Sequence, residues 1–235
     1  MDQNDEHRMN SEDQRIINDY FKTLEDWKLL PAYKLETRID SIVGFALPEI
    51  IKDVKGYSVK AVIPELPLRV GTLLYEDKKR YDKKKWKQIA NKSNKVDFYV
   101  LTECHKNLFI EFKSDIGSLN DGQNGYLKKA KKCGMEKILD GIIKIASVTT
   151  YKNKYEHLLG KLNSCGLITG ENGNIHPTAK QSIIDLIYIL PTKPKKDIKQ
   201  EIIYYETLAD SISRSYKGSE MMERFASSII EWSND

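Results

Sequence analysis

The stretch NLFIEFKSD, residues 107 to 115, carries an acid and a lysine two positions apart within a run of large apolar residues. Successive side chains of a β-strand point to opposite faces, so Glu111 and Lys113 share one face of a strand here. The apolar side chains at 108, 110 and 112 then point the other way, toward a core. Two interpretations follow for the charged pair: a salt bridge on a solvated face, or a catalytic pair.

A second strand with an acid near its start precedes this one. It reads KVDFYVLT, contains Asp97, and is joined to NLFIEFK by the short polar turn ECHKN, which predicts an antiparallel hairpin. An acid two residues before a lysine also occurs elsewhere, for example at positions 53, 76, 77, 82 and 197. Only Glu111 and Lys113 lie in an alternating apolar strand that follows another strand with an acid.

Two carboxylates and a lysine on neighbouring strands suit metal-assisted hydrolysis of a phosphodiester. Mg²⁺ or Mn²⁺ prefers carboxylate, carbonyl and water oxygens. Asp97, Glu111 and the backbone carbonyl of Phe112 could hold one or two such ions against a phosphate, stabilising developing charge and activating water. Lys113 would orient or deprotonate that water, or neutralise the transition-state charge.

KVDFYVL, the thirteen residues between Asp97 and Glu111, and IEFK together resemble the PD-(D/E)XK nuclease superfamily. The similar core covers residues 37 to 132, and IDLIYILPTK resembles the strand that follows it in the family. The resemblance implies a restriction-endonuclease-like α/β fold, with a mixed central β-sheet flanked by helices. It also implies that Asp97, Glu111 and Lys113 are catalytic, whereas Val96 stands where the family usually has proline.

The resemblance implies further site residues outside the hairpin. RecB-like members carry a glutamine and a tyrosine on the next helix, and QNGY offers Gln123 and Tyr126 at a tighter spacing. Gln123 is therefore a candidate catalytic residue, and Tyr126 is better explained by packing. Members also often supply a glutamate from the first core helix. Glu49 fits by helical spacing at the border of an apolar face, and Glu65, on extended chain, is its rival.

Basic residues gather in three runs, although the net charge is only +4. Residues 78 to 95 hold nine Lys and Arg around one Asp, with Tyr81 and Trp86 among them, and smaller clusters lie at 128–132 and 193–196. Such runs suit phosphate backbones and stacked bases, whereas the alternative is a solvated face. The predicted nucleic-acid-binding residues are Lys83, Lys84, Lys85, Trp86, Lys87, Lys128 and Lys129.

The remaining pattern predicts the elements around the hairpin. Ser11 caps an expected helix that runs to Trp27, and a second helix begins at Thr37 and is bent or divided near Pro48. Extended chain interrupted by Pro64 and Pro67 follows. One helical pattern follows Ser118. Beyond it, the sequence predicts a helix over 154–165, a central strand over 182–193, and amphipathic helices over 199–212 and 218–232.

Composition limits the class of protein. Of 235 residues, 40% are hydrophobic and 31% charged, which suits a globular protein. The polar, acidic start of the chain predicts a disordered N-terminus over 1–10, followed by a single domain over 11–235 with a helical C-terminal part. No apolar run approaches the ~20 residues that span a bilayer, so a membrane is not expected as a partner. Three separated cysteines without a CxxC pair favour a reducing, cytoplasmic location.

The expected partner is nucleic acid, most readily DNA, and a homodimer is left open. The first hypothesis is a Mg²⁺-dependent deoxyribonuclease. The second is a binding protein on a nuclease-like scaffold that no longer cuts. The third is a structural α/β protein in which Glu111 and Lys113 form only a salt bridge. The clustered acids favour the first hypothesis, because a protein that only binds phosphate has no use for them.

Overall fold

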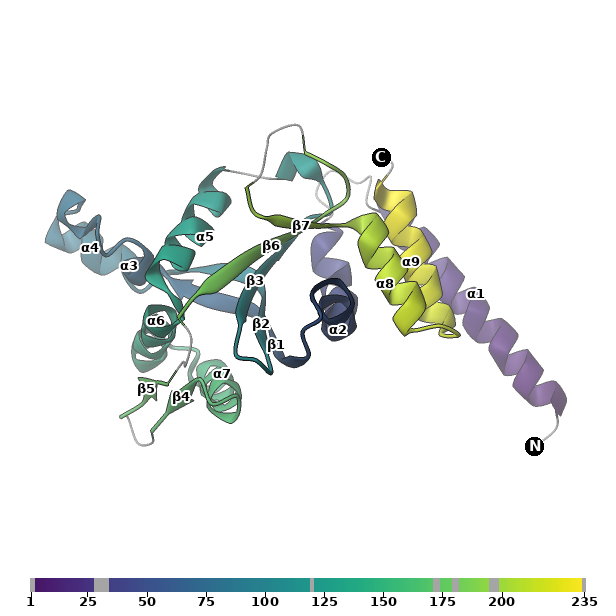
Figure 1. The fold of residues 1–235 in the computed structure, drawn as a ribbon, viewed down its shortest axis with the longest axis horizontal. Coiled ribbons are helices and arrows are strands. Elements are labelled where there is room, and N and C mark those ends of the chain that lie inside the picture. Colours follow the sequence, from purple (N-terminus) through teal and green to yellow (C-terminus); the bar gives the residue numbers. More distant parts are fainter. Residues whose placement is uncertain are drawn as a thin grey trace. The chain divides into compact units, whose positions relative to one another are not determined.

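The computed structural model describes residues 3–27, 34–118, 121–170, 174–178, 182–194 and 199–233. A mixed five-stranded central sheet, flanked by helices, runs in the order β1-β2-β3-β6-β7 (Figure 1). Its strands are β1 (Val59–Arg69), β2 (Ser93–Thr102), β3 (Asn107–Phe112), β6 (Ile184–Leu190) and β7 (Glu201–Tyr204). The mixed α/β class expected from the sequence is therefore confirmed, and its restriction-endonuclease-like form stays a prediction.

The predicted hairpin is present, and its first partner strand contains two prolines. β1 pairs antiparallel with β2, and β2 pairs antiparallel with β3. Pro64 and Pro67 were expected to interrupt the extended chain, but both lie inside β1, opposite Phe98 and Lys95. β1 is an edge strand, and it is on edge strands that sheets accommodate proline.

The chain divides into two compact units, and the sequence had predicted a single domain. The first contains Met1–Gly56, Phe112–Ser118 and Tyr188–Asp235, and the second contains Tyr57–Glu111 and Leu119–Ile187. The helical elements of the first unit are α1 (Gln3–Trp27), α2 (Glu36–Lys55), the short 3₁₀ turn η2 (Ile116–Ser118), α8 (Tyr205–Ser215) and α9 (Glu220–Ser233).

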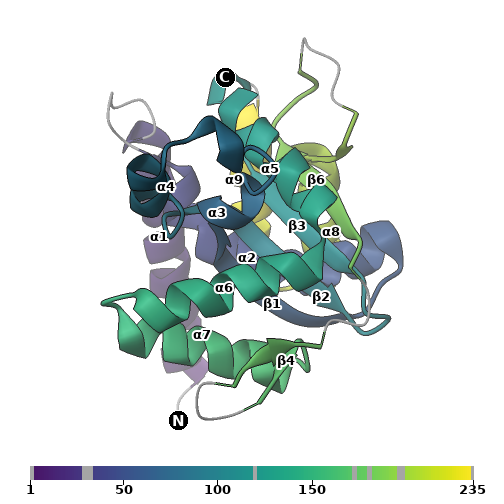
Figure 2. The same cartoon turned by 90° about the vertical axis from the view of Figure 1, so that its left-hand side faces the viewer.

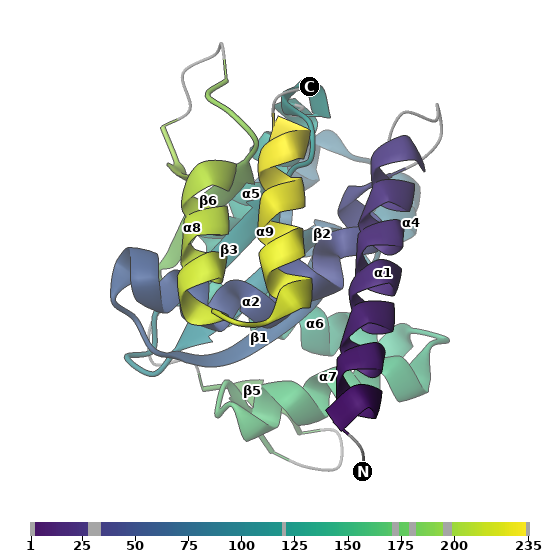
Figure 3. The same cartoon turned by 90° about the vertical axis from the view of Figure 1, so that its right-hand side faces the viewer.

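The core of the first unit is built from amphipathic helices. In Figure 3, α9 lies beside both α8 and α1, which agrees with their contacts. Phe21 of α1 packs against Phe225 and Trp232 of α9, with ring centroids 6.0 and 6.4 Å apart. The apolar residues of α2 recur at helical spacing and are fully buried, from Ile39 to Ile51. Burial of these faces supplies the hydrophobic stabilisation of the unit.

The second unit surrounds the β1–β2–β3 hairpins with short helices and a small two-stranded sheet. Its further elements are α3 (Val70–Leu73), η1 (Lys78–Arg80), α4 (Lys83–Ile89), α5 (Asp121–Cys133), α6 (Met135–Val148), α7 (Lys152–Ser164), β4 (Ile168–Thr169) and β5 (His176–Pro177). α6 packs against β1, and α7 lies beside α6 (Figure 2). Both faces of β3 are covered, because all six of its residues are buried.

Three expected helices differ in the structure. α1 begins at Gln3, upstream of Ser11, so residues 3–10 are helical. α2 begins at Glu36 and continues through Pro48 without division. The helix expected over 199–212 begins as strand β7, because β-branched Ile202 and Ile203 favour extended pairing, and α8 starts only at Tyr205.

The helical pattern after Ser118 is also divided. α5 ends at Cys133 and α6 begins at Met135, with Gly134 between them at φ 80°. A side chain there would be strained by the positive φ, and a Cβ would lie 2.4 Å from Ser182 Oγ. Gly134 therefore separates the two helices. In the described part of the chain, no helix is both long and apolar enough to cross a membrane.

Candidate functional site

Asp97 and Glu111 occupy facing positions on neighbouring strands of the second unit. The register pairs Phe98 of β2 with Ile110 of β3, so one step further along both strands Asp97 lies opposite Glu111. Directly opposite residues of an antiparallel pair point to the same face, with Cβ atoms about 5 Å apart. The expectation that these two acids lie on adjacent strands is confirmed.

The surroundings of Glu111 are not a solvated face. Glu111 is only 1% exposed, and Asp97 is half-buried. Like charges directly opposite each other destabilise a strand pair, and a buried carboxylate is costly unless positive charge or hydrogen bonds compensate it. The prediction that this strand face is solvated is therefore wrong, and an ion pair between Glu111 and Lys113 stays a prediction. A position of this kind is suited to a bound cation.

A buried polar group lies further along the same face. Tyr99 lies two residues after Asp97 on β2, and Asn107 lies four residues before Glu111 on β3, so all four side chains belong to one face. Tyr99 Oη donates a hydrogen bond of 2.9 Å to Asn107 Oδ1. Burial raises the pKa of the Tyr99 phenol well above its usual range, so it stays protonated. The amide of Asn107 in turn donates to Ile183 O. This network fixes the hairpin on the face that carries the two acids.

Glu65 lies on the strand next to Asp97, a position that the sequence alone did not establish. Its neighbours Pro64 and Leu66 pair with Phe98 and Val96, which places Glu65 opposite Asp97 on the edge strand. Its backbone is left-handed, with φ 55°, and its carboxylate pairs with Lys95. The Glu65 side chain is 51% exposed, so this acid is held at the surface by a lysine.

Glu49, the rival of Glu65, belongs to the first unit and lies in α2. Its side chain is 43% exposed and forms an ion pair of 3.9 Å with Lys52, three residues on. Its charge also raises the pKa of Tyr216, after the larger effect of burial. These surroundings are those of a surface glutamate on a helix.

Lys113 follows β3 and is held by its backbone. Its side chain is only 5% exposed. Its N–H donates to Ile189 O at 3.0 Å, and its carbonyl accepts a 2.8 Å bond from the phenol of Tyr205. The Tyr205 ring stacks on Phe112 at 5.8 Å, the residue whose backbone carbonyl was a predicted metal ligand. Lys113 is therefore anchored by its backbone and buried, unlike the exposed lysines of the basic runs.

Residues predicted on the following helix are placed unequally. Gln123 belongs to α5 by its backbone, and its side chain lies outside the described residues. Tyr126 donates from Oη to Lys95 O at 2.7 Å, which ties α5 to β2 two residues before Asp97. Tyr126 therefore has a structural bond to the strand that carries the acid, in agreement with packing.

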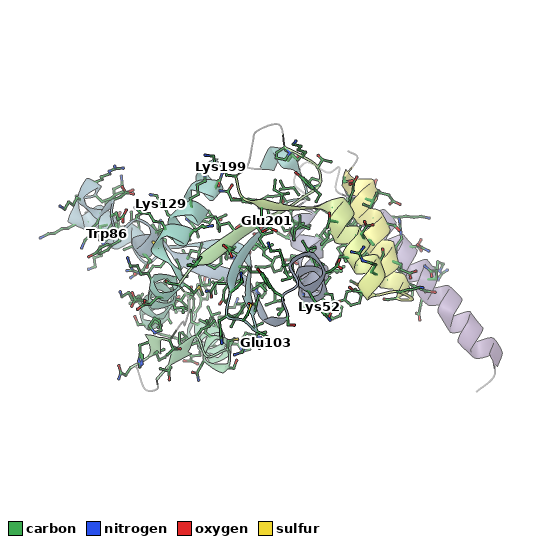
Figure 4. All side chains as sticks on the ribbon, in the orientation of Figure 1. Lys52, Trp86, Glu103, Lys129, Lys199 and Glu201 are labelled. Carbon is green, nitrogen blue, oxygen red and sulfur yellow. The ribbon has the colours of Figure 1, made fainter. Side chains whose placement is uncertain are left out.

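The predicted nucleic-acid-binding residues form two groups in the second unit. Lys83, Lys84, Lys85 and Lys87 are exposed on α4, which Asp82 caps by accepting a 2.8 Å bond from Lys85 N. Trp86 is half-buried on the same helix (Figure 4).

Aromatic and basic side chains alternate around α4. Its Trp86 ring lies 6.0 Å from that of Tyr81. Lys78 lies over the Trp86 ring at 5.9 Å, and Lys85 lies over the Tyr81 ring at 5.7 Å. On α5, Lys128 is exposed, whereas Lys129 forms an ion pair of 2.8 Å with Asp77. Within the third run, residues 195–198 lie outside the described part of the structure.

The donor set at the acidic pair is small. Among the described residues, no group of three or more His, Cys, Asp or Glu side chains is arranged to hold a metal ion. A divalent ion beside Asp97 and Glu111 would therefore take its other ligands from backbone carbonyls, water and substrate, as Mg²⁺ commonly does. Two carboxylates on one face fit a hard cation in their chemistry.

Comparison of the chain with protein-family models, with curated proteins and with solved structures finds no match.

Proposed function

We propose that this protein is a Mg²⁺- or Mn²⁺-dependent nuclease that hydrolyses phosphodiester bonds of DNA. The observation that carries the proposal is the facing pair of Asp97 and Glu111 on adjacent antiparallel strands, with Glu111 buried. Carboxylate oxygens brought together on one face of a sheet are the ligands that Mg²⁺ and Mn²⁺ prefer. The sequence resemblance to PD-(D/E)XK nucleases points to the same residues.

Asp97, Glu111 and the carbonyl of Phe112 would hold the metal. A bound divalent ion would stabilise negative charge on the scissile phosphate and lower the pKa of water at the site. Lys113 follows Glu111 by two residues in the sequence, and its buried ammonium would orient the attacking water or neutralise the transition-state charge. Its backbone is anchored by Ile189 and Tyr205, which fixes where the side chain leaves the strand.

The exposed lysines of α4, with Lys128, would bind the DNA backbone. Their ammonium groups neutralise phosphates without reading the sequence. Trp86 and Tyr81 offer aromatic faces on which unpaired bases can stack. Gln123 stays a candidate for positioning the phosphate from α5, and Glu49 a candidate for completing the site.

A specific observation favours a second candidate, a nucleic-acid-binding protein that does not cut. The described residues supply two acids and no third metal-ligating side chain at the pair, and both Glu49 and Glu65 are engaged by lysines. A site that had lost a ligand would retain the basic helix and lose hydrolysis. The two candidates differ in whether the protein cleaves DNA when a divalent metal is present.

The test is to incubate plasmid and single-stranded DNA with the protein in the presence and absence of Mg²⁺ or Mn²⁺. Cleavage that requires the metal, and that is lost in Asp97→Asn, is expected. In parallel, calorimetric titration should show weaker Mn²⁺ binding by Asp97→Asn than by the wild-type protein. DNA binding without metal-dependent cleavage would support the inactive binder, and equal Mn²⁺ affinity would remove Asp97 from the site.

A further inference from the structure

The second unit contains a cavity that the proposed nuclease site does not use. Its volume is about 700 Å³, within the range of small-molecule sites. It lies among the end of β1, the turn after α3, and the helices α5 and α6, and α3, α5 and α6 contact one another. The lining residues used below are Arg69, Tyr75, Glu76, Lys129, Lys132 and Lys137. No motif in the sequence brings these positions together.

The cavity is separate from the acidic pair, although both belong to one unit. Arg69 pairs with Ser93 at the start of β2, and Asp97 lies four residues further along that strand. At a rise of about 3.3 Å per residue, the two positions are ~13 Å apart along the strand. The cavity therefore offers contacts that the two carboxylates do not provide.

Positive charge exceeds negative charge in the cavity. Five basic and three acidic side chains line it, a formal excess of two positive charges. Three of the lysines are partly neutralised by the three acids: Lys129 pairs with Asp77 at 2.8 Å, Lys132 with Glu76 at 2.7 Å and Lys144 with Asp140 at 2.5 Å. Lys137 has no carboxylate within 4.0 Å among the described residues, so its charge is available to a ligand.

Arg69 is held in place at the cavity wall. Its guanidinium donates through Nε and Nη2 to Asn91 Oδ1, at 2.9 and 2.7 Å. A Cβ at Gly71 would lie 2.7 Å from Arg69 Nη1, so glycine leaves the room that this guanidinium occupies. Burial lowers the pKa of Arg69, but an arginine stays charged near neutrality. A fixed planar guanidinium beside a flexible ammonium suits phosphate oxygens.

The turn after α3 adds an aromatic surface. Tyr75, part of the cavity lining, is 71% exposed and offers a ring face to a planar ligand. A phosphate contact beside an aromatic ring matches the two parts of a nucleotide. We propose that this cavity binds the phosphate of a nucleotide, either free or at the 5′ end of a nucleic-acid strand.

The acids of the cavity supply the most discriminating test. Glu76 repels an anion and competes for Lys132, so Glu76→Gln should tighten nucleotide binding several-fold. Lys137→Gln should weaken binding several-fold, because it removes the unpaired cation. Both side chains are exposed, and neither change should affect folding. Lys161→Gln, an exposed position on α7 with the same charge change as Lys137→Gln, is the matched control and should leave affinity unchanged.

The measurement is calorimetric titration of the full chain without divalent metal, so that its result does not depend on cleavage. The probes are ADP, and a single-stranded oligonucleotide carrying either a 5′ phosphate or a 5′ hydroxyl. Saturable ADP binding would identify a free nucleotide, whereas a preference for the 5′ phosphate alone would identify a strand end. No saturable binding of ADP together with no effect of the 5′ phosphate would overturn the proposal. So would equal affinities in Lys137→Gln, Glu76→Gln and the wild-type protein.

Discussion

The acidic pair and the basic helix α4 belong to the same unit, yet they hold their charges in opposite surroundings. Glu111 is buried on a strand with both faces covered, opposite Asp97. The lysines of α4 are exposed, and the helix touches the remainder of the unit mainly through α3. One region removes a charge from water, and the other leaves its charges where water and salt screen them.

This difference determines how much each region says about function. An exposed lysine contributes little to stability whatever its role, so its presence has many explanations. A buried carboxylate facing another carboxylate is destabilising and requires compensation. The acidic pair is therefore the stronger indication of chemistry, and α4 is informative as a set. Changes in the two regions should affect different measurements.

The largest effect is expected for Glu111→Gln, which keeps the shape of the side chain and removes its charge. Metal-dependent cleavage should fall on the order of 10³-fold, because a metal-binding carboxylate is lost. The protein should still fold, because glutamine keeps the size and shape of the buried side chain. Cleavage assays and thermal unfolding measure the two effects.

The matched control is Glu103→Gln, an exposed acid in the turn of the same hairpin (Figure 4). It should change neither rate nor stability. A Glu111→Gln protein that cleaves DNA at the wild-type rate would show that the buried pair has a structural role only.

The next effect concerns Lys113. Lys113→Ala should reduce cleavage on the order of 10²-fold, while Mn²⁺ affinity persists because Asp97 and Glu111 remain. Since Lys113 is 5% exposed, alanine also removes a buried stem and costs packing. Lys113→Met keeps most of that stem, so it should lose cleavage as Lys113→Ala does while retaining more stability. Full activity in the methionine variant would refute a catalytic ammonium.

A smaller effect, on binding alone, is expected at α4. Replacing Lys83, Lys84 and Lys85 by glutamine should weaken DNA binding about equally for all sequences. Each phosphate contact contributes about 0.9 to the slope of log affinity against log salt for duplex DNA, so up to about 2.7 of the slope should be lost. Binding measured at several salt concentrations gives this slope.

The control for this change removes the same charge elsewhere. Lys154, Lys161 and Lys217 are exposed lysines outside the predicted runs, and their triple glutamine variant should retain the wild-type slope. An equal loss of slope in both triple variants would show that α4 acts only through net charge.

The hairpin could be predicted because its signals are local. Alternation around Phe98 and Ile110 and a short polar turn determine the register that brings Asp97 opposite Glu111. The burial of Glu111 could not be predicted, because it depends on elements distant in the sequence that cover both faces of β3. The same is true of the cavity, where Arg69 and Lys137 come together only through packing of α6 against β1.

Local sequence patterns also failed to predict some short or interrupted elements. β7 has four residues and depends on pairing within the sheet, so its isoleucines fitted a helical period equally well. Gly134 follows a lysine-rich turn, which is a known sign of a helix end, and the division between α5 and α6 was therefore open to prediction. Proline at an edge strand is tolerated, and β1 could not be identified as an edge before the sheet order was known.

The smallest effect is expected for Tyr205→Phe, which tests whether Tyr205 supports the strand or takes part in cleavage. Tyr205 is fully buried, stacks on Phe112, and donates 2.8 Å to the carbonyl of Lys113. Tyr205→Phe keeps the ring and removes the hydroxyl, which leaves that buried carbonyl without its donor and should cost about 1 kcal/mol, or about 2–4 °C in melting temperature. Tyr216→Phe deletes the hydroxyl of a half-buried tyrosine whose contact with Phe45 O is 3.4 Å long, and it should cost less. Because Tyr205 bonds to the backbone of Lys113 and not to its ammonium, cleavage measured well below the melting temperature should fall only a few-fold. A loss comparable to that of Lys113→Met, with the melting temperature unchanged, would place Tyr205 in the chemistry and contradict its assignment to the support of the strand.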